Sequence, residues 1–177
     1  HVDGMRERTI IVNGVSKAYA MTGWRIGFIA APEWIVKACN KLQGQYTSGP
    51  CSVSQKAAEA AYTTSQECVE TMRKAFERRR DLIVELASQI PGLEVNKPEG
   101  AFYLFPKCSS FYGKSYEGKT INNSTDLAMF LLETGHVATV GGDAFGDPDC
   151  FRMSYATSDD NIREAMKRIK ETLALLK

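Results

Sequence analysis

One short stretch of the sequence places a lysine and an arginine among small and apolar residues. Lys17 follows an apolar run, and Arg25 begins the next one. Burial disfavours the ammonium form of a lysine, and the neutral amine is a nucleophile. A guanidinium binds phosphate through paired hydrogen bonds, and Gly23 and Gly27 allow a close backbone approach. By spacing alone, a surface lysine beside a structural arginine is the commoner arrangement.

A second arginine lies in an apolar run near the end of the sequence. Arg152 stands between Phe151 and Met153, in a run that has the composition of a β-strand. The planar fork of a guanidinium can hold a carboxylate in a fixed orientation. A salt bridge at the end of a strand is the alternative role for this residue.

The loop around Lys17 is expected to lie between two buried strands. Residues 9–12 and 25–31 are short apolar runs that end at turn or breaker residues. The carboxyl ends of strands in α/β sheets are common ligand sites, so Lys17 occupies a suitable place. Helical spacing predicts helices at residues 33–46, 52–63, 65–89, 124–133 and from 158 to the end. Ser52 or Ser54, Ser124 and Ser158 are the predicted N-caps of the second, fourth and fifth of these helices.

Strand patterns become frequent in the second half of the sequence, at residues 93–95, 101–105, 137–140 and 151–155. Between them, residues 107–123 are rich in Ser, Gly, Lys and Tyr and are expected to form an exposed loop. The basic run at 78–80 has acidic neighbours on the same predicted helix, which indicates a solvated, salt-bridged face.

The order of these elements predicts an α/β protein in two parts. Residues 1–65 are expected to be the end of a larger α/β domain, because their strands cannot close a sheet alone. Residues 66–177 are expected to form a compact α+β domain. The sequence begins with His1 and a polar segment rather than with Met, and we therefore expect a C-terminal fragment of a longer protein.

The composition is that of a soluble globular protein and excludes several classes of partner. Hydrophobic residues make up 44% and charged residues 24% of the 177, and the formal net charge is +1. This balance argues against a nucleic-acid or membrane partner. The five cysteines are odd in number and lack a C-x-x-C pair, and there are two histidines. We expect no disulfide framework, no metal site and a cytoplasmic location.

The residue pattern around Lys17 gives Lys17 and Arg25 a specific interpretation. Residues 16–27, S-K-A-Y-A-M-T-G-W-R-I-G, closely resemble the cofactor-lysine signature of the class I aminotransferases that depend on pyridoxal 5′-phosphate (PLP), especially the aspartate aminotransferase-like branch. The resemblance implies that Lys17 forms a Schiff base with PLP and later moves protons, and that Arg25 pairs with the PLP phosphate. Ser16 either joins the cofactor contacts or is purely structural. Gly14 stands where many relatives have a phosphate-binding hydroxyl.

Further segments resemble the same family in the same order. Residues 151–156, F-R-M-S-Y-A, resemble a strand whose arginine clamps the substrate α-carboxylate, which implies this role for Arg152. Residues 98–103 resemble a G-A-F-Y segment of the small domain. Residues 141–146 resemble a P-G-x-x-F-G loop, with Gly141 in place of proline, which is expected to loosen the loop. Residues 47–50 resemble a segment near the subunit interface, with Gly49 where asparagine is usual.

The resemblance implies the C-terminal part of PLP-dependent transferase fold type I, from a protein that forms a homodimer. Its activity would be transfer of an amino group between an amino acid, with aspartate favoured, and a 2-oxo acid. The aspartate that pairs with the pyridine nitrogen, and other cofactor contacts, precede the lysine in this family. We therefore expect the 177-residue chain alone to be inactive. The alternatives are a PLP-dependent C–S lyase or synthase of the same fold, the PLP-binding sensor domain of a transcription regulator, or a scaffold that has lost activity.

Overall fold

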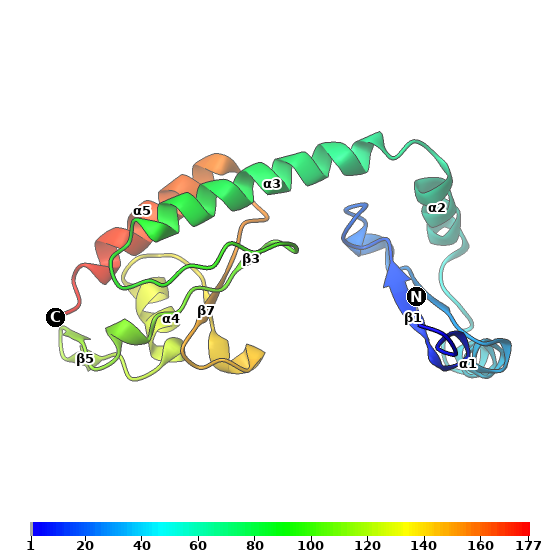
Figure 1. Ribbon diagram of the computed structural model, residues 1–177, viewed down its shortest axis with the longest axis horizontal. Helices are drawn as coiled ribbons and strands as arrows, with labels where there is room; N and C mark the ends of the chain where they lie inside the picture. Colours follow the sequence, from blue (N-terminus) through cyan, green and yellow to red (C-terminus); the bar gives the residue numbers. More distant parts are fainter. Residues whose placement is uncertain (1) are drawn as a thin grey trace. The chain divides into compact units, whose positions relative to one another are not determined.

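The chain divides into two units within its longest helix, and each unit has its own arrangement of helices and strands. The computed structural model describes residues 2–177. The first unit ends at Met72 and the second covers Arg73–Lys177, so the division falls inside α3 (Glu67–Ser88) (Figure 1). The domain boundary expected from the sequence, after residue 65, stays a prediction.

The first unit contains an antiparallel pair of strands, β1 (Ile11–Gly14) and β2 (Gly27–Ala30). Both strands lie close to the predicted runs, but the prediction that they are buried is wrong. The side chain of Val12 is 76% exposed, and Phe28 is also exposed. Within the part of the chain that the structure describes, each of these strands pairs only with the other. No neighbouring strand therefore covers their apolar side chains.

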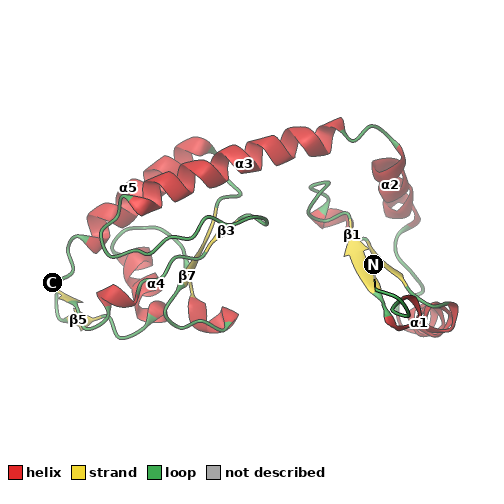
Figure 2. Cartoon of the chain, viewed as in Figure 1, coloured by secondary structure: helices red, strands yellow, loops and turns green. Residues whose placement is uncertain are grey.

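Two α-helices lie wholly within the first unit, α1 (Glu33–Tyr46) and α2 (Ser52–Thr63) (Figure 2). The bounds of α1 agree with the predicted range, because Pro32 fixes the backbone just before its first turn. None of the residues of α1 is buried, including Trp34. The N-cap of α2 is Cys51, so the prediction of a serine cap is wrong. The backbone of Ser52 is already helical, and Ser54 is buried in the helix.

The second unit has its own sheet, in which β7 (Phe151–Ser154) is the middle strand. It pairs antiparallel with β3 (Tyr103–Leu104) on one side and with β6 (Val140–Gly141) on the other. The core of the unit combines one face of this sheet with α3, α4 (Ser124–Glu133) and α5 (Asp159–Leu173). Its largest fully buried hydrophobic side chains include Leu104, Leu127, Leu131, Phe151, Tyr155 and Ile169.

Residues 107–123 depart from the prediction of an exposed loop. A short 3-10 helix (Ser109–Phe111) and a hairpin of β4 (Ser115–Tyr116) and β5 (Lys119–Thr120) lie in this segment. Cys108, Phe111 and Ile121 are buried in the core. The prediction missed these three residues because most of the segment is polar. Their burial removes apolar surface from water and so stabilises the second unit. The strand predicted at 93–95 is reduced to one bridge, Glu94 to Lys107.

Of the two helix caps that the sequence predicts in the second unit, Ser158 is confirmed and Ser124 is wrong. Ser158 caps α5, accepting a hydrogen bond from the backbone N–H of Asn161 at 3.2 Å. Asn123, and not Ser124, caps α4 by accepting from the N–H of Asp126 at 2.8 Å. Ser124 occupies the first helical position instead, where its hydroxyl is available to a neighbouring loop.

The basic run on α3 forms ion pairs, as predicted. Arg78 donates to Asp159 at the start of α5 at 2.9 Å, and Arg80 lies 2.9 Å from Asp81. The hydrogen bond and charge of Arg78 hold the pKa of the Asp159 carboxyl below its usual value. Among the helices of residues 2–177, none is long and apolar enough to cross a membrane.

Candidate functional site

The loop that contains Lys17 is anchored at both ends and at its middle. Val15 and Ile26, at the two ends, are 0% and 9% exposed and pack with Ala58 of α2. Tyr19 donates a hydrogen bond from its hydroxyl to Gln66 Oε1 at 2.7 Å. The burial of Val15 and Ile26 fixes both ends of the loop against α2, and Lys17 lies between these two anchors.

Lys17 lies in a turn of this loop, and its side chain is exposed. The sequence predicted that apolar neighbours would bury it, and this is wrong for the residues that the structure describes. Its apolar neighbour Val15 belongs to the buried cluster with Ile26 and Ala58, and Met21 packs against that cluster. The amine is thus presented at the surface of the first unit.

Arg25 adopts a backbone conformation that is uncommon for a residue with a side chain. Its φ is +53°, and a second residue of the same loop, Ala20, has φ +54°. Left-handed backbone at non-glycine residues costs on the order of 1 kcal/mol and clusters at functional sites. One nitrogen of the Arg25 guanidinium donates to the Thr22 carbonyl at 2.8 Å, which holds the side chain close to its own loop.

The strands that frame the loop approach each other too closely for a side chain at Gly14. A Cβ atom there would lie 2.8 Å from the carbonyl oxygen of Ile26, so this backbone does not admit the hydroxyl that many relatives have at this position. Ser16 is the nearest hydroxyl in the sequence and is half-buried. It remains the candidate for that contact, and its role stays a prediction.

Arg152 lies on β7 in the second unit, against two aromatic rings. Its Cζ atom is 4.3 Å from the ring centre of Tyr103 and 4.1 Å from that of Phe145. Within residues 2–177, no carboxylate forms an ion pair with this arginine, so the strand-end salt bridge is not observed. The sequence did not identify either ring as a contact. The only indication of either ring in the sequence is that both residues lie in segments that resemble the family.

The loop before β7 is held tightly, although Gly141 was expected to loosen it. It forms a short 3-10 helix (Gly142–Phe145). The N–H of Gly142 donates to the buried hydroxyl of Ser124 at 2.9 Å. A Cβ atom on Gly142 would lie 2.0 Å from the carbonyl oxygen of Asp147. The loop therefore closes around a position that only glycine fills.

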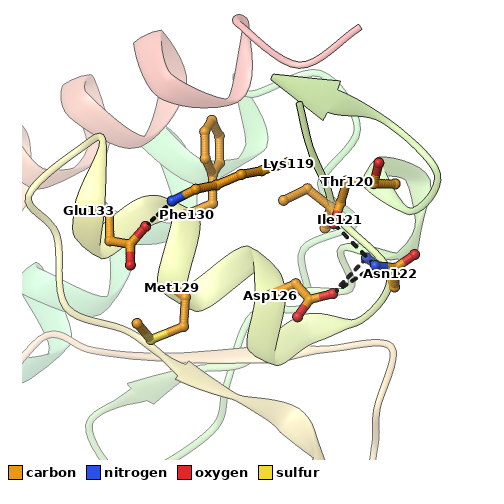
Figure 3. A pocket seen from close by; sticks show the side chains of 8 residues that line it. All are labelled: Lys119, Thr120, Ile121, Asn122, Asp126, Met129, Phe130 and Glu133. Atoms are coloured by element: carbon orange, nitrogen blue, oxygen red, sulfur yellow. Dashed lines mark hydrogen bonds and ion pairs between the residues drawn. The ribbon is translucent and has the colours of Figure 1, made fainter. Parts of the chain in front are cut away.

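A pocket of about 410 Å³ on the second unit contains none of the predicted site residues. It lies between β5 and α4, where Lys119 reaches Glu133 at 2.6 Å and Asn122 bonds to Asp126 (Figure 3). These polar groups satisfy one another. The pocket is therefore not part of the candidate site.

Comparison with known proteins identifies the family of this chain. The sequence model of the family described as aminotransferase class I and II matches residues 1–169. This chain belongs to the class I and II aminotransferases. It is 50% identical, over 98% of its length, to a bifunctional aspartate aminotransferase and glutamate/aspartate-prephenate aminotransferase of Petunia hybrida. It is 48% identical, over 94% of its length, to an aspartate aminotransferase of Rhizobium meliloti strain 1021.

The three-dimensional structure agrees with this family. A crystal structure of an aspartate aminotransferase from Rhizobium meliloti superposes with a TM-score of 0.96 at 46% identity, covering 99% of this chain and 44% of that one. The fold is therefore the PLP-dependent fold type I of the aminotransferases, as predicted. The chain spans 37% of the Petunia relative and 41% of the Rhizobium one.

The cofactor of this aminotransferase family is PLP, and the residues of the first unit fit it. An exposed primary amine, Lys17, can react with an aldehyde carbon. Arg25 offers a guanidinium for the phosphate, on a loop whose strained backbone is held by buried anchors. Lys17 and Arg25 are thus the residues of this chain that would hold the cofactor, one by a covalent and the other by an ionic contact.

Proposed function

We propose that the whole protein transfers an amino group between an amino acid and a 2-oxo acid with PLP as cofactor, and that aspartate is the favoured amino donor. The observation that carries the proposal is the anchored loop that presents Lys17 and the left-handed Arg25 together. Membership of the class I and II aminotransferases supports it, as do the relatives named for aspartate.

In this proposal each residue of the loop has a distinct task. Lys17 binds the cofactor through its Nζ atom and, once released by the substrate, accepts the proton of the substrate Cα. Arg25 holds the phosphate end by charge and hydrogen bonds, with Ser16 as a further contact. Bound PLP supplies an electron sink for the substrate Cα.

Arg152 is proposed to hold the α-carboxylate that every amino acid and 2-oxo acid substrate carries. A guanidinium fixes a carboxylate in one plane. This orientation aligns the Cα–H bond for proton transfer, which is how positioning lowers a barrier. The lack of a carboxylate partner within residues 2–177 supports this assignment.

The acceptor that the family resemblance favours is 2-oxoglutarate, and the relatives' names add a second candidate. Relatives from Petunia hybrida and Cereibacter sphaeroides are named for both aspartate and prephenate. We propose 2-oxoglutarate as the acceptor, with prephenate as the second candidate. These relatives do not favour a C–S lyase or synthase or a transcription sensor. A homodimer and a cytoplasmic location stay predictions.

Borohydride trapping tests the proposal directly. The full enzyme is incubated with PLP, reduced with borohydride and digested, and the pyridoxyl mass is located by mass spectrometry. We expect the label on Lys17, and its loss in a Lys17→Ala variant. Lys37, an exposed lysine of α1 paired with Glu33 at 2.7 Å, is the matched control, and Lys37→Ala should keep the label. A folded enzyme without label on Lys17 would refute the assignment.

A further inference from the structure

Arg152 projects from the face of the sheet opposite the core. Along β7, Phe151 and Met153 are buried and Arg152 between them is only half-buried. Successive side chains of a strand point to opposite faces, so Arg152 faces away from the side that packs in the core. Its backbone is fixed, because β7 is the middle strand and Val140 of β6 lies opposite Arg152.

The aromatic contacts of Arg152 leave its hydrogen-bond donors available. The cation lies over the rings of Tyr103 and Phe145, 4.3 and 4.1 Å from their centres, well within the range of about 6 Å for cation–π attraction. Cation–π attraction acts through the positive charge of a guanidinium and does not occupy its hydrogen-bond donors, so its five N–H donors can still serve a ligand. Rings can therefore orient this group without competing with a ligand for its donors.

The two rings are themselves held in place. Tyr103 belongs to β3, which pairs with β7. Phe145 ends the short 3-10 helix that begins at Gly142, where the backbone is fixed by the hydroxyl of Ser124. Phe105 meets the Phe145 ring edge-on, with centres 6.2 Å apart and planes at 89°. Rigid neighbours are what a positioning contact requires.

We propose that Tyr103 and Phe145 form an aromatic bracket that positions the guanidinium of Arg152 for the substrate α-carboxylate. This inference rests on the proposed function, which gives Arg152 that carboxylate. Neither ring needs to touch the substrate, so both are positioning residues. Because the amino acid and the 2-oxo acid both carry an α-carboxylate, the bracket serves both substrates equally, whatever their side chains.

Binding of succinate to the PLP-loaded enzyme tests the bracket without relying on turnover. Succinate has the two carboxylates of aspartate and no amino group to react. Tyr103→Leu and Phe145→Leu should each raise its Kd about fivefold (roughly 3- to 30-fold), as expected from the strength of cation–π contacts. Tyr103→Phe keeps the ring and should restore the parent Kd. In turnover, KM for aspartate and for 2-oxoglutarate should rise by similar factors.

Control variants separate this inference from the proposed function. Val140→Ala removes an exposed apolar neighbour of Arg152 that has no ring, and it should bind succinate like the parent. Arg152→Leu should lose succinate binding. If it does and both ring variants bind like the parent, the bracket is wrong and the proposed function stands. If Arg152→Leu binds succinate normally, the carboxylate role of Arg152 and the bracket are both overturned, whereas the borohydride label on Lys17 still decides the proposed amino-group transfer. Phe145→Met, which keeps apolar bulk without a ring, should behave like Phe145→Leu.

Discussion

The two units of this chain bury their apolar residues to very different extents. The second unit has a continuous core built from its sheet, α3, α4 and α5. The buried hydrophobic cluster of the first unit consists of Val15, Ile26 and Ala58, while Val12, Trp34 and other large apolar side chains are exposed. The three hydrophobic residues of this cluster are those that hold the lysine loop.

The largest expected effect of this difference is on independent folding. We expect residues 66–177, expressed alone, to unfold cooperatively on heating, because their core is complete within the segment. Residues 2–65 alone should show no cooperative transition, since their apolar surface is exposed. Circular dichroism melts of the two segments measure this. A cooperative melt of residues 2–65 would contradict the comparison.

A smaller effect, on the free energy of unfolding, is expected from one substitution at a buried position and one at an exposed position. Phe151→Ala should lower the free energy of unfolding by about 3–5 kcal/mol, as for other fully buried aromatic side chains. Phe151 is 0% exposed, whereas Ile11 of β1 is 55% exposed. Ile11→Ala should therefore cost less than about 1 kcal/mol. Guanidinium chloride unfolding of the two variants gives both values, and equal losses would mean that β1 is covered in the folded protein.

Cysteine reactivity gives the most local comparison of the two units. Burial raises the pKa of the Cys108 and Cys150 thiols in the second unit to about 11, whereas Cys39, Cys51 and Cys68 are exposed. Hydrogen bonding from the Ser54 backbone lowers the pKa of Cys51.

Thiolates are the reactive form, and a thiol with a raised pKa becomes a thiolate only at higher pH. At pH 7.5, iodoacetamide should thus modify Cys51 first, and Cys108 and Cys150 roughly 100-fold more slowly than an ordinary thiol. Peptide mass mapping over time measures the order. Labelling of Cys108 and Cys150 should accelerate as the pH approaches 11, and early labelling at pH 7.5 would show that the second core opens readily.

Elements that are specified by neighbouring residues could be predicted from the sequence. Pro32 sets the start of α1, and a capping side chain sets the start of α4 and of α5. These determinants, and the apolar face of each helix, lie within or next to the helix itself. Lys17, Arg25 and Arg152 were selected in the same way, from short segments that resemble the family, and their roles stay predictions.

Features that depend on distant residues could not be predicted. The burial of Phe111 and Ile121 depends on a core formed by α4 and α5. The exposure of Val12 depends on which strands lie beside β1. The contact of Arg152 with Tyr103 joins positions far apart in the chain, and no local pattern marks such a pair.

The strand order of the second unit also determines when its sheet can form during protein synthesis. β3 and β6 do not hydrogen-bond to each other, and β7 lies between them. Ribosomes add residues in chain order, so both outer strands emerge before the strand that joins them. Until Phe151–Ser154 has left the ribosome, this sheet cannot form and the core of the unit lacks one of its sides. During that interval the apolar side chains of α4 are exposed on the nascent chain, which is when a chaperone would be needed most.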